Sequence, residues 1–131
     1  MNRDDVQRWL DAYVEAWQTY DPDQVATLFS AEAEYRYHPF DEEPAKGGAA
    51  IAASWVEEDR RDEPGTFDAH YEPVAVDGDI AVATGVSRYY TDATRSTLDR
   101  EYGNAFLMRF DSEGRCVAFT EYYMKRAQGP G

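Results

Sequence analysis

The hydrophobic period of this sequence changes near residue 66, and that change limits the folds it can adopt. Before this point apolar residues recur every three or four positions, as on one face of an α-helix. After it apolar and polar residues alternate, as on a β-strand with one buried face. The clearest helical stripe consists of Val6, Trp9, Leu10, Tyr13, Val14, Trp17 and Tyr20. Helices gathered first and strands gathered second are typical of an α+β domain.

Two more helices are predicted in the first half of the chain. Asp21 is placed as an N-cap, with Pro22 at the first helical position and Gln24 three residues after the cap. A third helix is predicted from Gly48 through AAIAASWVEEDRR, closed by the breaker run DEPG. Between these helices AEYRYH alternates as a strand that ends at Pro39, because proline cannot donate to a strand ladder. The following segment, FDEEPAKG, is expected to be a loop.

The second half of the chain predicts four consecutive antiparallel strands. Their sequences are FDAHYEPVAV, DIAVATGVSRYY, STLDREYGNAFLMRF and CVAFTEYYMKR, all rich in β-branched and aromatic residues. The turn sequences VDGD, TDATR and DSEG separate them. We therefore expect one domain over residues 1–131, an α+β fold in which a cone-shaped, curved antiparallel sheet packs on three N-terminal helices. A sheet bent around a helix in this way encloses a cavity.

The charge of the chain disfavours several classes of partner. Twenty-six acidic and 13 basic residues give a net charge of -13, which repels phosphate backbones and anionic lipid surfaces. Neither nucleic acid nor membrane is therefore expected as a partner. The single cysteine, Cys116, cannot form an intrachain disulfide, and charges stand where a signal peptide would need an apolar run. These features favour a cytoplasmic location.

The order of the elements, together with several local strings, resembles the nuclear transport factor 2-like superfamily, which includes SnoaL-like polyketide cyclases and ketosteroid isomerases. The matching strings are AYVEAWQTYDPDQVATLFSAEAEY, HPFDEEPAKGGAAIAASW and FLMRFDSEGRCVAFTEYY. The resemblance implies a cone-shaped, cystatin-like α+β barrel over nearly the whole chain. In some members of the superfamily the open mouth of the cone receives small hydrophobic molecules.

Two catalytic candidates follow from comparison with the isomerase branch. Resemblance to that branch implies three functional positions. They are a tyrosine on the first helix, a carboxylate base just before a Pro-Phe pair, and a protonated acid on a later strand. Tyr13 and His38 fall on the first two positions, with His38 in place of the carboxylate in the string HPF. Phe106 falls on the third, so one donor of the oxyanion hole would be missing.

The chemistry expected of this pair is acid–base catalysis. His38 could take a proton from a carbon acid or from water while the Tyr13 hydroxyl polarises a carbonyl or epoxide oxygen. A structural interpretation stands beside each assignment. His38 could be a strand-end histidine hydrogen-bonded to a loop carbonyl or to Glu34, and Tyr13 could be a core tyrosine on an apolar helix stripe.

Other polar residues are predicted to line the same cavity. If Phe106 points inward, alternation brings Tyr102 and Asn104 to the inner face as well. Asn104 is predicted as an orienting hydrogen-bond donor, with a satisfied strand amide as the alternative. Arg36 shares a face with His38 and could meet an acidic ligand group, or form an ordinary ion pair. The apolar wall is predicted to consist of Trp17, Trp55 and Tyr123.

No metal site or cofactor is predicted, because His38 and His70 lie on different segments without metal-ligand spacing. Three functions remain open. The first is an acid–base enzyme of the isomerase, cyclase or hydrolase kind, acting on a small hydrophobic or carbonyl-containing molecule through His38 with Tyr13 or Asn104. The second is a non-catalytic ligand-binding module. The third is an interaction module that forms a homodimer through the outer face of the sheet.

Overall fold

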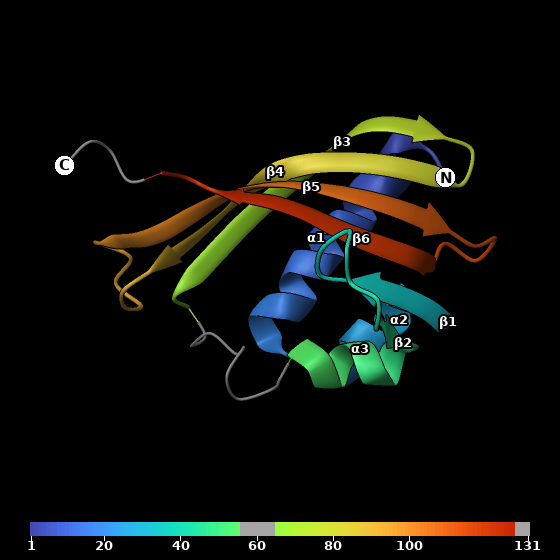
Figure 1. The fold of residues 1–131 in the computed structure, drawn as a ribbon, viewed down its shortest axis with the longest axis horizontal. Coiled ribbons are helices and arrows are strands. Elements are labelled where there is room, and N and C mark those ends of the chain that lie inside the picture. Colours follow the sequence, from blue (N-terminus) through green and yellow to red (C-terminus); the bar gives the residue numbers. More distant parts are fainter. Residues whose placement is uncertain (56–64, 128–131) are drawn as a thin grey trace.

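The computed structural model describes residues 1–55 and 65–127, which form helices packed on one face of a curved sheet (Figure 1). The helices are α1 (Arg3–Thr19), α2 (Pro22–Leu28) and α3 (Gly48–Trp55). The strands are β1 (Phe29–Arg36), β2 (Ala45–Lys46), β3 (Phe67–Asp77), β4 (Ile80–Tyr90), β5 (Leu98–Phe110) and β6 (Cys116–Lys125). The predicted continuation of α3 into VEEDRR lies outside the described residues.

The helix starts follow from local capping. At α1 the Asp5 N–H donates to Asn2 Oδ1 at 2.8 Å, and the Asn2 N–H donates to Asp5 Oδ2 at 3.0 Å. This reciprocal pair is a capping box, which satisfies backbone donors that the helix leaves open. At α2 the side chain of Asp21 accepts from the Asp23 N–H at 3.0 Å, with Pro22 next to the cap. The predicted start of α2 is confirmed.

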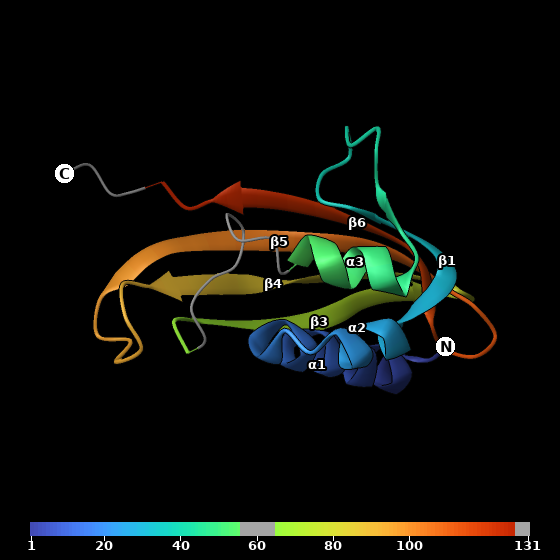
Figure 2. The same cartoon turned by 90° about the horizontal axis from the view of Figure 1, so that it is seen from below.

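The sheet has the strand order β2-β1-β6-β5-β4-β3 and does not close, so β2 and β3 are its edges. Figure 2 shows the strands bending over the helices. The predicted α+β class and the antiparallel run of the last four strands are confirmed. One pairing differs from the fully antiparallel sheet that we expected, because β1 lies parallel to β6. The short strand β2 was also predicted as loop.

The predicted strand AEYRYH is displaced toward the N-terminus. β1 already begins at Phe29 and ends at Arg36, two residues before His38. Residues 38–41 instead form a turn closed by the Asp41 N–H, which donates to the His38 carbonyl at 3.1 Å. The strand therefore ends before Pro39, which has no N–H to donate to a neighbouring strand, and His38 belongs to the turn.

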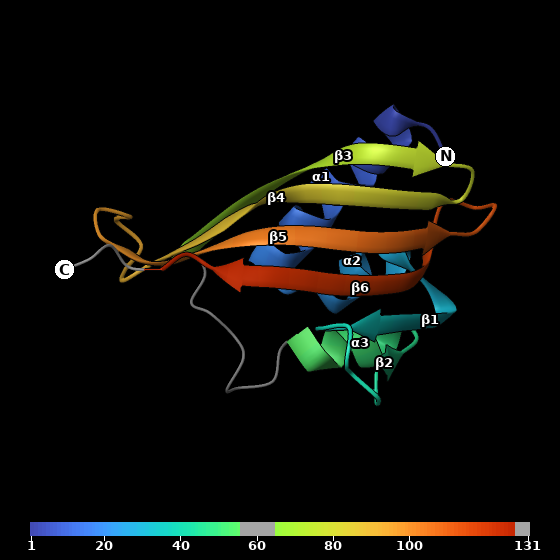
Figure 3. The same ribbon diagram turned by 45° about the horizontal axis from the view of Figure 1, so that its top comes forward.

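The hydrophobic core lies between the helices and the inner face of the sheet, with the helices behind the strands in Figure 3. Trp9 is 6% exposed and packs edge-on against Phe29 and Phe110, each at a ring-centroid distance of 5.5 Å. Its indole Nε1 donates to the Leu28 carbonyl at 3.0 Å, so α1 is fixed to the junction of α2 and β1. Within the described residues no helix is long and apolar enough to cross a membrane.

Candidate functional site

A cavity of about 190 Å³ lies between α1, α3 and the inner face of the sheet. We call it the inner chamber. It is lined mostly by tyrosine and tryptophan, with a single carboxyl among its described residues. The lining consists of Tyr13, Trp17, Tyr35, Tyr37, Ser54, Trp55, Tyr71, Ser87, Tyr89, Asn104 and Glu121.

A second cavity of about 250 Å³ adjoins the first, and we call it the outer chamber. It shares Tyr37, Ser87, Tyr89, Asn104 and Glu121 with the inner chamber and adds Arg100, Tyr102 and Tyr123. Because the two chambers share these residues, they lie side by side. The aromatic inner chamber is the more enclosed of the two, and we call the more open chamber with Arg100 the mouth of the cavity.

Glu121 is the carboxyl at the centre of this space. It stands on β6 opposite Phe106 of β5 and two residues after the buried Phe119, so alternation turns it to the inner face. The residue keeps partial exposure, and it lines both chambers. Burial among aromatic rings raises the pKa of Glu121 to about 8, and a hydrogen bond with Tyr13 offsets part of the effect. The carboxyl is therefore mostly protonated at neutral pH.

Two buried phenols stand behind Glu121. The hydroxyls of Tyr13 on α1 and Tyr35 on β1 are 2.7 Å apart. Burial raises the pKa of both phenols well above the usual value, and the nearby Glu121 adds to the increase. Both therefore stay neutral and can act as hydrogen-bond donors. The Tyr35 hydroxyl, the Tyr13 hydroxyl and the Glu121 carboxyl are hydrogen-bonded in that order, and this chain leads into the inner chamber.

A hydrogen-bonded pair of polar side chains, Ser87 and Asn104, lines both chambers together with Glu121. Ser87 Oγ on β4 donates to Asn104 Oδ1 on β5 at 3.0 Å. This bond uses the amide oxygen of Asn104, which leaves its two N–H donors for a ligand in the chamber. Tyr71 on β3 reaches the same region, because Gly85 lies opposite it on β4. A β-carbon at Gly85 would lie 2.1 Å from the His70 carbonyl oxygen, so only glycine fits there.

The structure brings most of the predicted site residues together. Tyr13, Asn104, Trp17 and Trp55 line the inner chamber, and Asn104 lines both chambers. Tyr102, predicted on the inner face, and Tyr123, predicted as apolar wall, line the outer chamber, where their rings meet edge-on at 5.9 Å.

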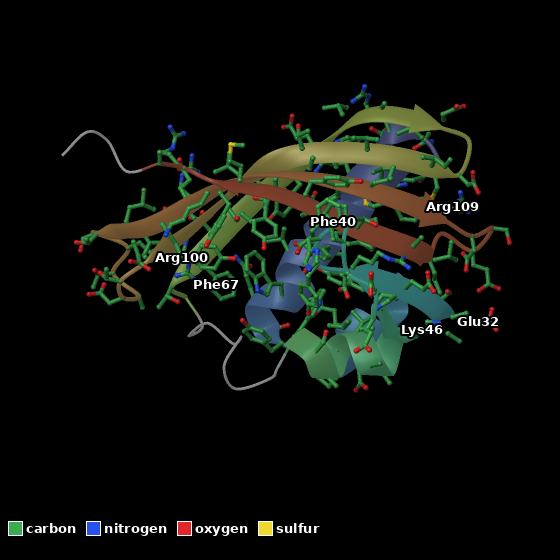
Figure 4. The ribbon with its side chains drawn as sticks, viewed as in Figure 1. Glu32, Phe40, Lys46, Phe67, Arg100 and Arg109 are labelled. Carbon is green, nitrogen blue, oxygen red and sulfur yellow. The ribbon has the colours of Figure 1, made fainter. Side chains whose placement is uncertain are left out.

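Three predicted site residues lie elsewhere. His38 is exposed in the turn after β1, and its Nδ1 accepts from the Phe40 N–H at 3.1 Å, as in the structural interpretation. Phe40, labelled in Figure 4, is 85% exposed on this loop. Arg36 faces outward, because Tyr35 takes the inner face, and its Nη1 contacts Glu34 at 3.1 Å. Phe106 points inward as predicted, but it is a core residue packed on Tyr13 and Tyr71.

Glu121 was not among the predicted site residues, although its position in the strand indicates the inner face. The strand CVAFTEYYMKR places Glu121 two residues after Phe119, so an inward Phe119 implies an inward carboxyl. Tyr35 was missed because it was treated as part of a strand end. Arg100 could have been found in the same way as Tyr102, since it lies two residues earlier on the same strand.

Among the described residues no group of three or more His, Cys, Asp or Glu side chains is arranged to hold a metal ion. The polar groups on the described lining residues are one carboxyl, several hydroxyls, two indole N–H groups, one amide and one guanidinium. Such a set can donate hydrogen bonds to an oxygen atom and exchange a proton with it.

The sequence model of the SnoaL-like domain family matches residues 10–119 of the chain. The chain belongs to this family. As a SnoaL-like domain it is a member of the nuclear transport factor 2-like superfamily, and the predicted resemblance is confirmed. No curated protein matches the sequence.

Solved structures share the fold of this SnoaL-like domain at low sequence identity. A nuclear transport factor 2-like protein with a cystatin-like fold from Novosphingobium aromaticivorans has a TM-score of 0.64 and 23% identity over 91% of this chain and 79% of that one. An epoxide hydrolase of the LEH-like type from M. tuberculosis has a TM-score of 0.61 and 17% identity, covering 93% and 84%. A candidate ketosteroid isomerase from Kribbella flavida has a TM-score of 0.67 and 16% identity, covering 98% and 84%. These similarities concern the fold.

Proposed function

We propose that this SnoaL-like domain is an acid–base enzyme, of the isomerase, cyclase or hydrolase kind, that acts on a small, partly apolar molecule with a carbonyl or epoxide oxygen. The observation that carries the proposal is the Glu121 carboxyl, buried among aromatic rings at the meeting of both chambers, with a pKa of about 8. A group with a pKa near working pH is suited both to give and to take a proton. The fold is shared with an epoxide hydrolase and a candidate ketosteroid isomerase, which makes such chemistry compatible with it.

Each group has a separate role in the proposed reaction. The Glu121 carboxyl gives its proton to the substrate oxygen, while the Asn104 amide donates a hydrogen bond to the same atom. The Tyr13 hydroxyl, supported by Tyr35, stabilises the carboxylate that forms. For a ketone, this carboxylate then takes a proton from the carbon next to the carbonyl, which yields the enol and restores the acid. Trp17 and Trp55 hold the apolar part of the substrate.

Deuterium exchange tests this step without knowledge of the natural substrate. A panel of small cyclic ketones is incubated with the protein in D2O, and loss of the α-proton signals is followed by NMR. The wild-type protein is expected to exchange the α-protons of at least one ketone, and Glu121→Gln to reduce the rate by a factor of about 100 or more. Exchange that is equally fast with Glu121→Gln would contradict the role of the carboxyl.

A non-catalytic ligand-binding module is the second candidate. The observation that favours it is the position of His38 outside both chambers, which leaves Glu121 as the one carboxyl or imidazole among their described lining residues. If this candidate is correct, ketones bind to the wild-type protein and to Glu121→Gln, but neither protein exchanges their protons.

A further inference from the structure

The mouth of the cavity contains a cation in a chain whose net charge is -13. Arg100 stands two residues before Tyr102 and four before Asn104 on β5, so alternation brings all three to the inner face. It pairs with Tyr89 of β4, and its guanidinium carbon lies 4.1 Å from the centroid of the Tyr89 ring. This cation–π contact holds the guanidinium against a wall that both chambers share.

Arg100 also has an acidic neighbour. Its Nη1 contacts Asp99 Oδ2 at 3.0 Å, and the side chains are 32% and 52% exposed, respectively. Ion pairs with this degree of exposure contribute about 0 to 1 kcal/mol, so the Asp99 contact itself opposes the binding of a ligand anion only weakly. Glu121 supplies the one carboxyl among the described residues that line the chambers. This carboxyl is mostly protonated at pH 7, so it repels a bound anion only weakly.

We propose that the ligand of this cavity is a carboxylate, whose anionic group binds Arg100 in the outer chamber and whose aromatic or alicyclic body fills the inner chamber. The proposal rests on the small-molecule site described above and adds the class of molecule it accepts. A guanidinium pairs with a carboxylate through two parallel hydrogen bonds, which fixes orientation as well as position. The anchored end then directs the apolar end toward Trp17, Trp55 and Glu121.

A matched pair of ligands tests this assignment. Binding of 2-naphthoate and of 2-naphthamide is measured by isothermal titration calorimetry at pH 7 and low salt. The two molecules have the same ring system and differ in the charge of one substituent. The wild-type protein is expected to bind 2-naphthoate about tenfold more tightly than 2-naphthamide, since a charge-assisted bidentate contact replaces a neutral one.

Arg100 variants connect this difference to one residue. Arg100→Gln is expected to abolish the preference for 2-naphthoate while leaving the affinity for 2-naphthamide within about twofold, which also shows that the cavity is intact. Arg100→Lys keeps the charge without the planar fork, so an intermediate preference is expected. Arg109→Gln is the control for net charge, because Arg109 is exposed at the opposite end of β5 from Arg100 (Figure 4).

The outcomes separate this proposal from the one it rests on. If the wild-type protein binds both ligands equally, or if Arg100→Gln keeps the preference, the carboxylate assignment is overturned while the small-molecule site stands. If neither ligand binds to the wild-type protein, the carboxylate assignment is overturned, and the exchange of ketone α-protons decides separately on the proposed function. If Arg109→Gln reduces 2-naphthoate binding as much as Arg100→Gln does, the preference is an effect of net charge and the role of Arg100 is overturned.

Discussion

Replacing Glu121 by glutamine is expected to stabilise the protein, and to do so more as the pH rises. In the unfolded chain the pKa of this carboxyl is about 4.5, whereas burial raises it to about 8 in the folded protein. Below pH 4.5 the group is protonated in both states, so its ionisation does not lower the free energy of unfolding. Between these two values the unfolded state releases its proton first, so folding stability falls as pH rises, and above pH 8 the loss is complete.

The magnitude follows from the size of the pKa difference. A tenfold change in proton affinity corresponds to about 1.4 kcal/mol, so a pKa of about 8 instead of 4.5 gives an upper limit near 5 kcal/mol. Glu121 keeps partial exposure to the chambers, and solvent there reduces this value. We therefore expect Glu121→Gln to be more stable than the wild-type protein by about 2 to 4 kcal/mol at pH 8.5, relative to their difference at pH 4.5.

Urea unfolding of both proteins, measured from pH 4.5 to 8.5, checks this expectation. The other carboxyls titrate alike in the two proteins and cancel in the difference. Glu101→Gln is a control without this dependence, because hydrogen bonds from Arg126 and Arg88 lower the pKa of Glu101, so that its titration affects stability below pH 4.5 and the difference from the wild-type protein stays flat between pH 4.5 and 8.5. Parallel pH dependences for the wild-type protein and Glu121→Gln would refute the argument that the Glu121 carboxyl is buried at a cost.

Three further predictions concern the core, the loop after β1 and the outer face of the sheet. Trp9→Ala is expected to lower the free energy of unfolding by about 3 to 5 kcal/mol, because it removes a buried indole; a urea-unfolding loss below about 1 kcal/mol would contradict the packing of α1. His38→Asn is expected to leave the melting temperature and the affinity for 2-naphthamide unchanged, since His38 is exposed outside both chambers; a large loss of affinity in calorimetry would return His38 to the site. We also expect a homodimer through the outer face of the sheet, where Leu107 and Met124 are 43% and 78% exposed; light scattering that gives a monomer at micromolar concentration would exclude it.

The elements that were predicted correctly are those with local signals. The apolar stripe of α1, the cap at Asp21 and the alternation of β3 to β6 depend on residues close together in the sequence. The parallel pairing of β1 with β6 could not be predicted in this way, because it joins segments more than 80 residues apart. β2 is two residues long and carries no periodic signal.

The site shows the same limit. Alternation correctly brought Asn104 and Tyr102 to the inner face, and the same rule applied to Phe119 would have brought Glu121 there. The raised pKa of Glu121 could not be predicted, because it depends on neighbours supplied by α1 and the sheet. His38 was misplaced because the strand before it ends two residues earlier than the alternation suggested.

The role of Glu121 as an acid is tested most directly by titrating its carboxyl carbon by ¹³C NMR, with Glu121→Gln to assign the signal. We expect an apparent pKa near 8, so that the acid is mostly protonated at neutral pH and can give a proton to a substrate oxygen. A value near 4.5, the ordinary range of an exposed glutamate, would contradict it, because Glu121 would then be a carboxylate at neutral pH.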